Sequence, residues 1–193
     1  NSYELNHQKP PTNKSPESLI NVGFVGRFHK IKQLDFYIDL AQIFHQKNIP
    51  IKFTLVGDGP EKPTLESKID KYKISQYFNL PGYSMNPSDY LIQMNMFFLP
   101  SYREAFSLAL LEAGASALPL FAFNVGGNKE IIINNYNGYL LDFGDINGIA
   151  EKIIFLINNP KTRNNMGLNA REYISKKFSL AKRINELEYY YSN

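Results

Sequence analysis

The stretch LINVGFVGRFHKIK, residues 19–32, indicates the fold of this chain most directly. It opens as a short apolar run that ends at Gly26, which is typical of a strand buried on both faces. Residues 33–48 follow it with apolar side chains at helical spacing from Leu34 to Phe44. We therefore expect a buried strand followed at once by a helix that covers it.

The same alternation continues along the chain. Apolar runs of strand length recur at residues 51–60, 77–83, 96–100, 119–123 and 138–142. Helices are predicted between them at residues 63–73, after Asn86 with Pro87 as the first helical residue, and at residues 106–116 and 128–134, with two or three more from Asp145. Fully apolar strands that alternate with helices predict a Rossmann-like three-layer α/β/α domain with a parallel sheet of about six strands. In such sheets ligands bind beyond the carboxyl ends of the strands.

Composition narrows the class of protein. The chain has 193 residues, 44% of them hydrophobic and 20% charged, which suits one globular domain. A formal net charge of +3 is too small for a nucleic-acid protein, so no nucleic-acid partner is predicted. The chain lacks cysteine, and it has no apolar run of about 18 residues that would predict a membrane-spanning helix. Since it also lacks a signal-peptide pattern, we expect a cytoplasmic location.

The expected boundaries also follow from composition. Residues 1–18 are polar and rich in proline, and we interpret them as an arm or interdomain linker. Residues 19–178 are expected to form the α/β domain and residues 179–193 a final helix. Because the first residue is Asn1 rather than Met, we expect a processed chain or a piece of a longer protein.

The loop after the first strand gathers cations, namely Arg27, Lys30 and Lys32. A diphosphate is the natural partner for such a loop, because an arginine donates hydrogen bonds as a fork and a lysine acts as a point charge. A solvated basic loop without a ligand is the alternative. His29, in the same loop, stays open between a surface residue and a site residue.

The loop after the second strand is marked by glycines. Gly57 and Gly59 permit close approach of a ligand or of a neighbouring loop, and a plain turn is the alternative. Lys62 stands where the dinucleotide fingerprint needs a third glycine, and no Walker A lysine pattern occurs. Neither a Rossmann dehydrogenase nor a P-loop NTPase is therefore supported.

Glu112 is the only charged residue in the apolar segment 105–123. A carboxylate in such surroundings needs hydrogen-bonding partners, and vicinal sugar hydroxyls would supply them. The alternatives are a structural ion pair with Arg27 or Lys32, or plain exposure.

Glu104 stands just before the helix predicted at residues 106–116. The first N–H groups of a helix have no partner within it, so those of Phe106, Ser107 and Leu108 are predicted to bind a phosphate. Glu104 either belongs to this site or only stabilises the helix dipole.

Glu130 follows the Gly126-Gly127 pair, and we interpret it as a charge at the start of a helix, with a site role as the alternative. No His, Asp or Glu cluster has metal-ligand spacing, and no Gly-x-Ser-x-Gly nucleophile elbow occurs. We predict no metal site and no cofactor.

Taken in order, these motifs resemble the C-terminal, donor-binding half of family-4 retaining glycosyltransferases, the glycosyl transferases group 1 family with the GT-B fold. The resemblance runs from about residue 21 to the end of the chain. It rests on GFVGRFHKIK (23–32), LVGDGP (55–60), FLPSYREAFSLALLEAGASALPLFAF (98–123), NVGGNKEII (124–132) and NYNGYLL (135–141). Each stretch is a weak signal alone, and their order makes the resemblance specific.

The resemblance implies roles for individual residues. Arg27 and Lys32 match the cations that hold the donor diphosphate. Glu104 matches the first glutamate of the E-x7-E motif, which contacts the transferred sugar, and would form the catalytic set with those two cations. Glu112 matches the second glutamate, which binds ribose hydroxyls. The other implied donor-binding positions are Gly26 and Gly59, the backbone of Phe106, Ser107 and Leu108, and, near the base, Tyr83 and Ser84.

The sequence departs from the family in two places. Ala105 stands where the family has Gly after the first glutamate, and Gln33 where it has Gly after the lysine. The methyl group of Ala105 would narrow the sugar pocket. The acceptor-binding N-terminal half of the family is also missing, so we expect the chain alone to be inactive. Residues 179–193 are expected to pack on that missing domain, leaving some tyrosines of residues 189–191 exposed or covered by a partner.

The activity implied by the resemblance is sugar transfer, with retention at the anomeric carbon, from a UDP-sugar or a GDP-sugar, the UDP-sugar being preferred. A glycan or lipid-linked acceptor in bacterial surface polysaccharide synthesis is expected, and any contact with the inner membrane face would come from the missing half. One alternative is a non-catalytic nucleotide-sugar-binding module of the same fold, for which Ala105 is the only hint. The other is a GT-B nucleotide-sugar epimerase, whose site groups we do not find.

Overall fold

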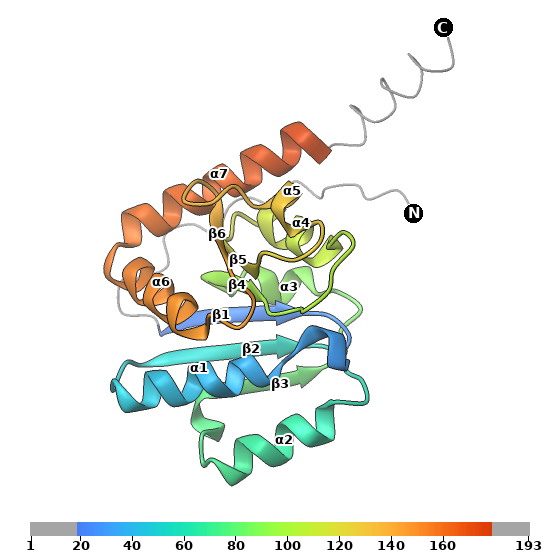
Figure 1. The fold of residues 1–193 in the computed structure, drawn as a ribbon, viewed down its shortest axis with the longest axis vertical. Helices are drawn as coiled ribbons and strands as arrows, with labels where there is room; N and C mark the ends of the chain where they lie inside the picture. Colours follow the sequence, from blue (N-terminus) through green and yellow to red (C-terminus); the bar gives the residue numbers. More distant parts are fainter. Residues whose placement is uncertain (1–18, 179–193) are drawn as a thin grey trace, which may run out of the picture.

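The computed structural model describes residues 19–178, which form a six-stranded sheet flanked by helices (Figure 1). The strands are β1 Ile20–Val25, β2 Ile51–Val56, β3 Phe78–Gly82, β4 Met96–Leu99, β5 Leu120–Phe123 and β6 Gly138–Leu141. All neighbouring strands are parallel. The Rossmann-like α/β fold predicted from the apolar runs is therefore confirmed. The predicted arm, the final helix and its tyrosines lie outside the described residues.

Helices and short turns connect the strands. They are η1 Lys30–Lys32, α1 Asp35–Gln46, α2 Lys62–Lys71, η2 Ser75–Tyr77, α3 Ser88–Leu91, α4 Leu108–Ala115, α5 Asn128–Ile131, α6 Ile146–Asn158 and α7 Pro160–Phe178. α1 contacts α2 and α6, and α4 packs on α7. α2 and α7 lie at opposite ends of the molecule (Figure 1). Within the described residues, no helix combines the length and apolarity needed to cross a membrane.

The strand order places β1 and β4 side by side in the middle of the sheet. The order is β3-β2-β1-β4-β5-β6, so the chain first winds outward from β1 and then returns to wind outward from β4. The winding reverses between β1 and β4, and doubly wound sheets bind ligands outside the carboxyl ends of the strands at this switch point. The two loops that lead from this point contain the cationic segment 26–32 and Glu104.

The β1–β4 ladder is short. Among the described residues, β1 pairs with β2 from Ile20 to Val25 but with β4 only at Val22↔Met96 and Gly23↔Phe97. The two central strands therefore stop pairing before they reach their carboxyl ends, and we call these unpaired ends the fork. This fork opens towards the two loops just named.

Aromatic side chains fill the core. Phe24, Phe53, Phe98 and Phe123 are completely buried. The Tyr37 ring of α1 contacts the first three of them, with centroids 5.5 to 6.5 Å apart, and the Phe98 and Phe123 rings lie 5.6 Å apart. Each such burial contributes about 1.5–3 kcal/mol relative to exposure. The core is therefore large enough to hold the domain together without disulfides.

Two predicted helices end or begin elsewhere because side chains cap them. α4 begins at Leu108 rather than at residue 106, since Ser107 has extended backbone and its Oγ accepts a hydrogen bond from Leu110 N at 3.2 Å. α5 ends at Ile131 rather than at residue 134. There the Asn137 side chain donates to the Ile131 carbonyl and accepts from Ile133 N, which replaces further helical hydrogen bonds.

Smaller differences lie at residues that flank helices, and α2 runs from Lys62 to Lys71 rather than over residues 63–73. α3 begins at Ser88, one residue later than predicted, with Pro87 as the residue before the helix. α1 begins at Asp35, because Gln33 adopts a left-handed conformation with φ of 49°. Glycine adopts that conformation most readily, which gives a physical reason for the family's glycine at this position.

Candidate functional site

Lys32 and Glu104 meet across the fork between β1 and β4. Lys32 ends η1, which follows β1, and Glu104 lies in the loop between β4 and α4. The Lys32 Nζ lies 2.7 Å from Glu104 Oε2, and the two side chains are 20% and 13% exposed. The sequence left open that Lys32 pairs with Glu112; in the structure its carboxylate partner is Glu104 instead.

The backbone of the Glu104 loop is held by two neighbours. Tyr102 N donates a hydrogen bond to the Ile31 carbonyl at 3.1 Å, and Gly127 N donates one to the Glu104 carbonyl at 3.0 Å. A Cβ atom on Gly126 would lie 1.8 Å from that same carbonyl oxygen. The glycine pair therefore allows the loop after β5 to contact the Glu104 loop backbone to backbone.

Glycines in the loop after β2 serve the same purpose for the cationic loop. Phe28 N donates to the Asp58 carbonyl at 2.8 Å, and a Cβ on Gly59 would lie 2.3 Å from the Phe28 carbonyl oxygen. A Cβ on Gly57 would lie 1.9 Å from the Gly26 carbonyl oxygen. The sequence left open whether these glycines make room for a ligand or for a neighbouring loop. In the structure they make room for the neighbouring loop.

Arg27 and Glu112 keep their charged groups available. Arg27 is exposed in the loop after β1, and no described residue forms an ion pair with it. Glu112 is half-buried in α4, and within residues 19–178 its carboxylate has neither a hydrogen bond nor an ion pair. The alternative interpretation of Glu112 as one half of a structural ion pair is therefore not supported.

The start of α4 supplies backbone donors, and Leu108 is one of the residues predicted for this role. Because the helix begins at Leu108, the unpaired N–H groups are those of Leu108 and Ala109, and Phe106 lies outside the helix. Ser107 is buried and its hydroxyl accepts the capping hydrogen bond. The Leu108 side chain is 52% exposed, so the first turn of α4 is open to a ligand.

Tyr83 and Ser84 lie further from the fork, after the edge strand β3. Tyr83 is 71% exposed, and its hydroxyl donates to Met85 Sδ at 3.2 Å. The Ser84 Oγ accepts a hydrogen bond from Asn86 N at 3.1 Å. Strands lie about 4.8 Å apart, so β3 ends roughly 10 Å from β1, a span that suits the two ends of a nucleotide.

Two residues left open by the sequence have structural contacts. The His29 Nδ1 accepts a hydrogen bond from Ile31 N at 3.3 Å and so caps η1. The Glu130 backbone carbonyl, rather than its carboxylate, accepts hydrogen bonds from Tyr173 and Lys177 of α7. In the described part of the chain, no group of three or more His, Cys, Asp or Glu residues could hold a metal ion.

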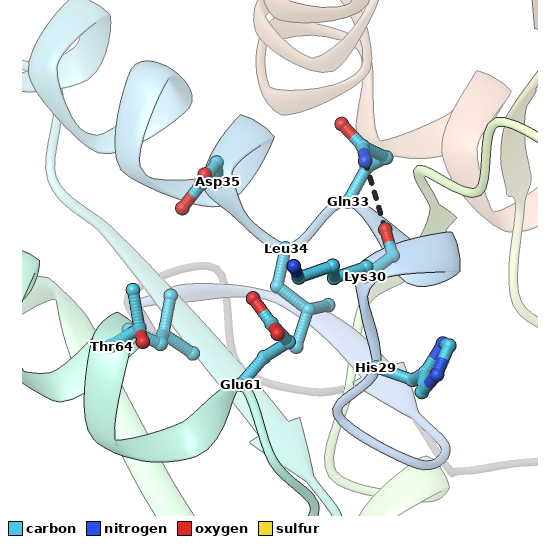
Figure 2. Close-up of a pocket in the computed structure, with 8 residues that line it drawn as sticks. His29, Lys30, Gln33, Leu34, Asp35, Glu61 and Thr64 are labelled. Atoms are coloured by element: carbon cyan, nitrogen blue, oxygen red, sulfur yellow. Dashed lines mark hydrogen bonds between the residues drawn. The ribbon is translucent and has the colours of Figure 1, made fainter.

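A pocket of about 240 Å³ lies on another side of the cationic loop, between the start of α1 and the start of α2 (Figure 2). Its lining residues are His29, Lys30, Gln33, Leu34, Asp35, Glu61, Thr64 and Leu65. None of them is a predicted donor-binding residue. Asp35, one of its charged members, is already paired with Lys68 at 2.6 Å.

Sequence reasoning missed two buried polar groups near the site. Ser101 Oγ and Asn128 Oδ1 are completely buried and have no hydrogen-bond partner among the described residues. Ser101 follows β4 and Asn128 is the first residue of α5, which follows β5. Both therefore lie beyond the carboxyl ends of the strands, as Glu104 does. For Ser101, a polar residue directly after an apolar strand was the only available signal.

The sequence pattern that defines glycosyl transferases group 1 matches residues 6–173. The chain belongs to this family. It is 32% identical over 169 residues to the N-acetyl-alpha-D-glucosaminyl L-malate synthase of Bacillus anthracis, covering 86% of this chain and 44% of that protein. It is 31% identical over 159 residues to the poly(ribitol-phosphate) alpha-N-acetylglucosaminyltransferase of Staphylococcus aureus strain COL, covering 82% of this chain and 32% of that protein.

The fold of this group 1 chain also matches solved structures. Its TM-score is 0.87, at 27% identity, against the crystal structure of a mutant of S. aureus TarM in complex with fondaparinux, alpha-GlcNAc-glycerol and UDP. That match covers 97% of this chain and 37% of the TarM chain. The chain therefore spans less than half the length of the two curated relatives and of TarM.

Proposed function

We propose that residues 19–178 are the nucleotide-sugar donor-binding domain of a glycosyltransferase. The contact between Lys32 and Glu104 at the β1–β4 fork carries this proposal, because it joins the two loops at the point where doubly wound sheets bind ligands. Arg27, in the loop after β1 and without an ion-pair partner in residues 19–178, supplies a second cation at the carboxyl end of β1. Membership of the group 1 family supports the same conclusion.

The residues suit the departure of a nucleoside diphosphate. Arg27, Lys32 and the first N–H groups of α4 would stabilise the charge that develops on the leaving diphosphate, which is an electrostatic role. Glu104 would position the sugar and Glu112 would accept hydrogen bonds from the ribose. Retention at the anomeric carbon, and transfer without a metal ion or cofactor, belong to the proposal on the strength of the family resemblance.

The relatives support a donor class. The names of both curated relatives describe N-acetylglucosaminyl compounds or transfer, and the TarM structure contains UDP. We therefore propose a UDP-sugar donor and an acceptor in surface polysaccharide synthesis, bound by an N-terminal domain that completes the enzyme. A cytoplasmic location, with any membrane contact made by that other domain, is part of the same proposal.

Calorimetric titration with UDP and GDP tests the donor site. The double variant Arg27→Ala/Glu112→Ala should weaken UDP binding more than tenfold, because each residue contributes a charged hydrogen bond worth about 1.5–3 kcal/mol. The matched control, Lys71→Ala/Glu66→Ala, removes one cation and one anion from the exposed face of α2 and should bind like the wild type.

Two results would contradict the proposal. One is a full-length parent protein that binds neither UDP nor GDP. The other is nucleotide binding that survives the Arg27→Ala/Glu112→Ala change. Transfer to an acceptor should require the full-length parent, so robust transfer by residues 1–193 alone would show that the N-terminal domain is dispensable.

A further inference from the structure

Tyr37 of α1 places its hydroxyl between the two central strands. The residue is completely buried, and its hydroxyl lies 2.9 Å from the Gly23 carbonyl oxygen of β1 and 2.8 Å from the Phe98 carbonyl oxygen of β4. Burial raises the pKa of the Tyr37 phenol well above its ordinary value, so the hydroxyl keeps its proton. A single proton is therefore shared between two backbone carbonyls on neighbouring strands.

These carbonyls stand where the β1–β4 ladder stops. The last paired residues are Gly23 and Phe97, while β1 continues to Val25 and β4 to Leu99. A buried carbonyl without a partner is costly, and strands that separate leave such groups behind. The Tyr37 hydroxyl lies within hydrogen-bond distance of the last paired residue on β1 and of the first unpaired residue on β4, and so links the two strands where the ladder ends.

Both strands lead directly into the candidate site. Gly26 and Arg27 follow Val25, and the Glu104 loop follows Leu99. The separation of the strand ends therefore sets the separation of the two loops that meet through Lys32 and Glu104. We infer that Tyr37 is a positioning residue for the donor site, acting through the spacing of β1 and β4; this inference rests on the proposed function.

The surroundings of Tyr37 allow its hydroxyl to be removed alone. Its ring contacts Phe24, Phe53 and Phe98, with centroids 6.5, 5.5 and 5.5 Å away. A phenylalanine ring fits the same space, so Tyr37→Phe keeps the aromatic packing and deletes only the shared hydrogen bonds. Sequence spacing predicted a buried α1 face here but gave no sign of a hydroxyl between strands.

The matched control is Tyr139→Phe. Tyr139 is 4% exposed on the edge strand β6, its ring contacts Phe121 with centroids 5.5 Å apart, and no described residue hydrogen-bonds its hydroxyl. Both variants are made in the 193-residue chain. Their UDP dissociation constants are measured by calorimetry well below the melting temperature, and hydrogen–deuterium exchange is measured without ligand.

We expect Tyr37→Phe to weaken UDP binding about three- to tenfold, the scale of one hydrogen bond. Exchange should become faster in peptides covering residues 26–32 and 101–107 and stay unchanged along β5 and β6. Tyr139→Phe should match the wild type in both measurements. A wild-type dissociation constant for Tyr37→Phe, or faster exchange spread evenly over the sheet, would overturn the inference.

The two measurements separate this inference from the proposed function. If the wild-type chain and its full-length parent bind neither UDP nor GDP, the proposed donor site is wrong and Tyr37 cannot be a positioning residue for it. If the wild type binds UDP and only the Tyr37→Phe result is negative, the donor site stands and Tyr37 belongs to the core alone.

Discussion

Replacing Glu104 by glutamine should make the site bind UDP more tightly. The Glu104 carboxylate lies 2.7 Å from the Lys32 ammonium. It therefore forms an ion pair with the cation that a diphosphate would bind. A ligand must therefore compete with Glu104 for Lys32 and also approach a negative charge. Glu104→Gln removes both obstacles and keeps the shape of the side chain.

The expected gain follows from the geometry. Unit charges about 4 Å apart interact by about 4 kcal/mol at an effective dielectric constant of about 20. Partial exposure of the Lys32–Glu104 pair reduces its net value to about 1 kcal/mol. A diphosphate carries more than one charge, so the released interaction should be about 1–1.5 kcal/mol, or a five- to tenfold lower Kd for UDP.

Calorimetric titration of UDP at low and high salt measures this gain. The difference between Glu104→Gln and wild type should shrink as salt rises, because exposed charges are screened. Glu66→Gln on α2 changes the net charge equally, far from the fork, and should leave the Kd unchanged. Glu112→Gln should weaken binding, since Glu112 pairs with no cation in residues 19–178 and the change removes one of its two acceptor oxygens for the ribose. Equal or weaker UDP binding by Glu104→Gln would refute the reasoning, because Lys32 would then not be the cation released to the diphosphate.

Three further changes test the frame of the site. Gly126→Ala should destabilise the domain by about 2 kcal/mol or more in urea unfolding, because its Cβ would lie 1.8 Å from the Glu104 carbonyl oxygen at a φ of +51°. The control Gly144→Ala, with a φ of +87° and open space around it, should lower the free energy of unfolding by less. Equal losses in the two variants would contradict the steric argument. Ala117→Gly should raise the free energy of unfolding by about 0.5–1 kcal/mol, since Ala117 has a φ of 59° just after α4, and no rise in melting temperature would show that the strain is absent. Ser107→Ala should cost about 1 kcal/mol in the same unfolding assay by removing the cap of α4, whereas an unchanged midpoint would mean that the cap contributes nothing.

The strands were predictable from the sequence because each is a continuous apolar run. Their order was not, since adjacency of β1 and β4 depends on where the chain returns after β3 and leaves no mark on either run. The burial of Leu34, Ile38 and Phe44 along α1 follows directly from helical spacing. Local caps, such as that of Ser107, moved helix ends by two residues.

Sequence reasoning proposed the candidate site as a set of residues, and the structure brings Lys32 and Glu104 of that set into contact. Arg27, Lys32, Glu104 and Glu112 stood out by charge and by position after strands. The sequence could not decide which glutamate pairs with Lys32, because the answer depends on where the backbone of the Glu104 loop lies. Backbone hydrogen bonds to Gly127 and Ile31 fix that position. The hydroxyl of Tyr37 was invisible for the same reason, since its acceptors are backbone atoms of two strands.

The loops around the fork contact one another through their main chains at glycine positions. These contacts are so close that a side chain would not fit there. The exposed side chains of Tyr83 and Leu108, next to these loops, take no part in those main-chain contacts. Those exposed positions can therefore vary without altering the main-chain contacts that hold the loops. A combinatorial library confined to them could retune ligand preference at small cost to folding, which suggests how one architecture accommodates many donors.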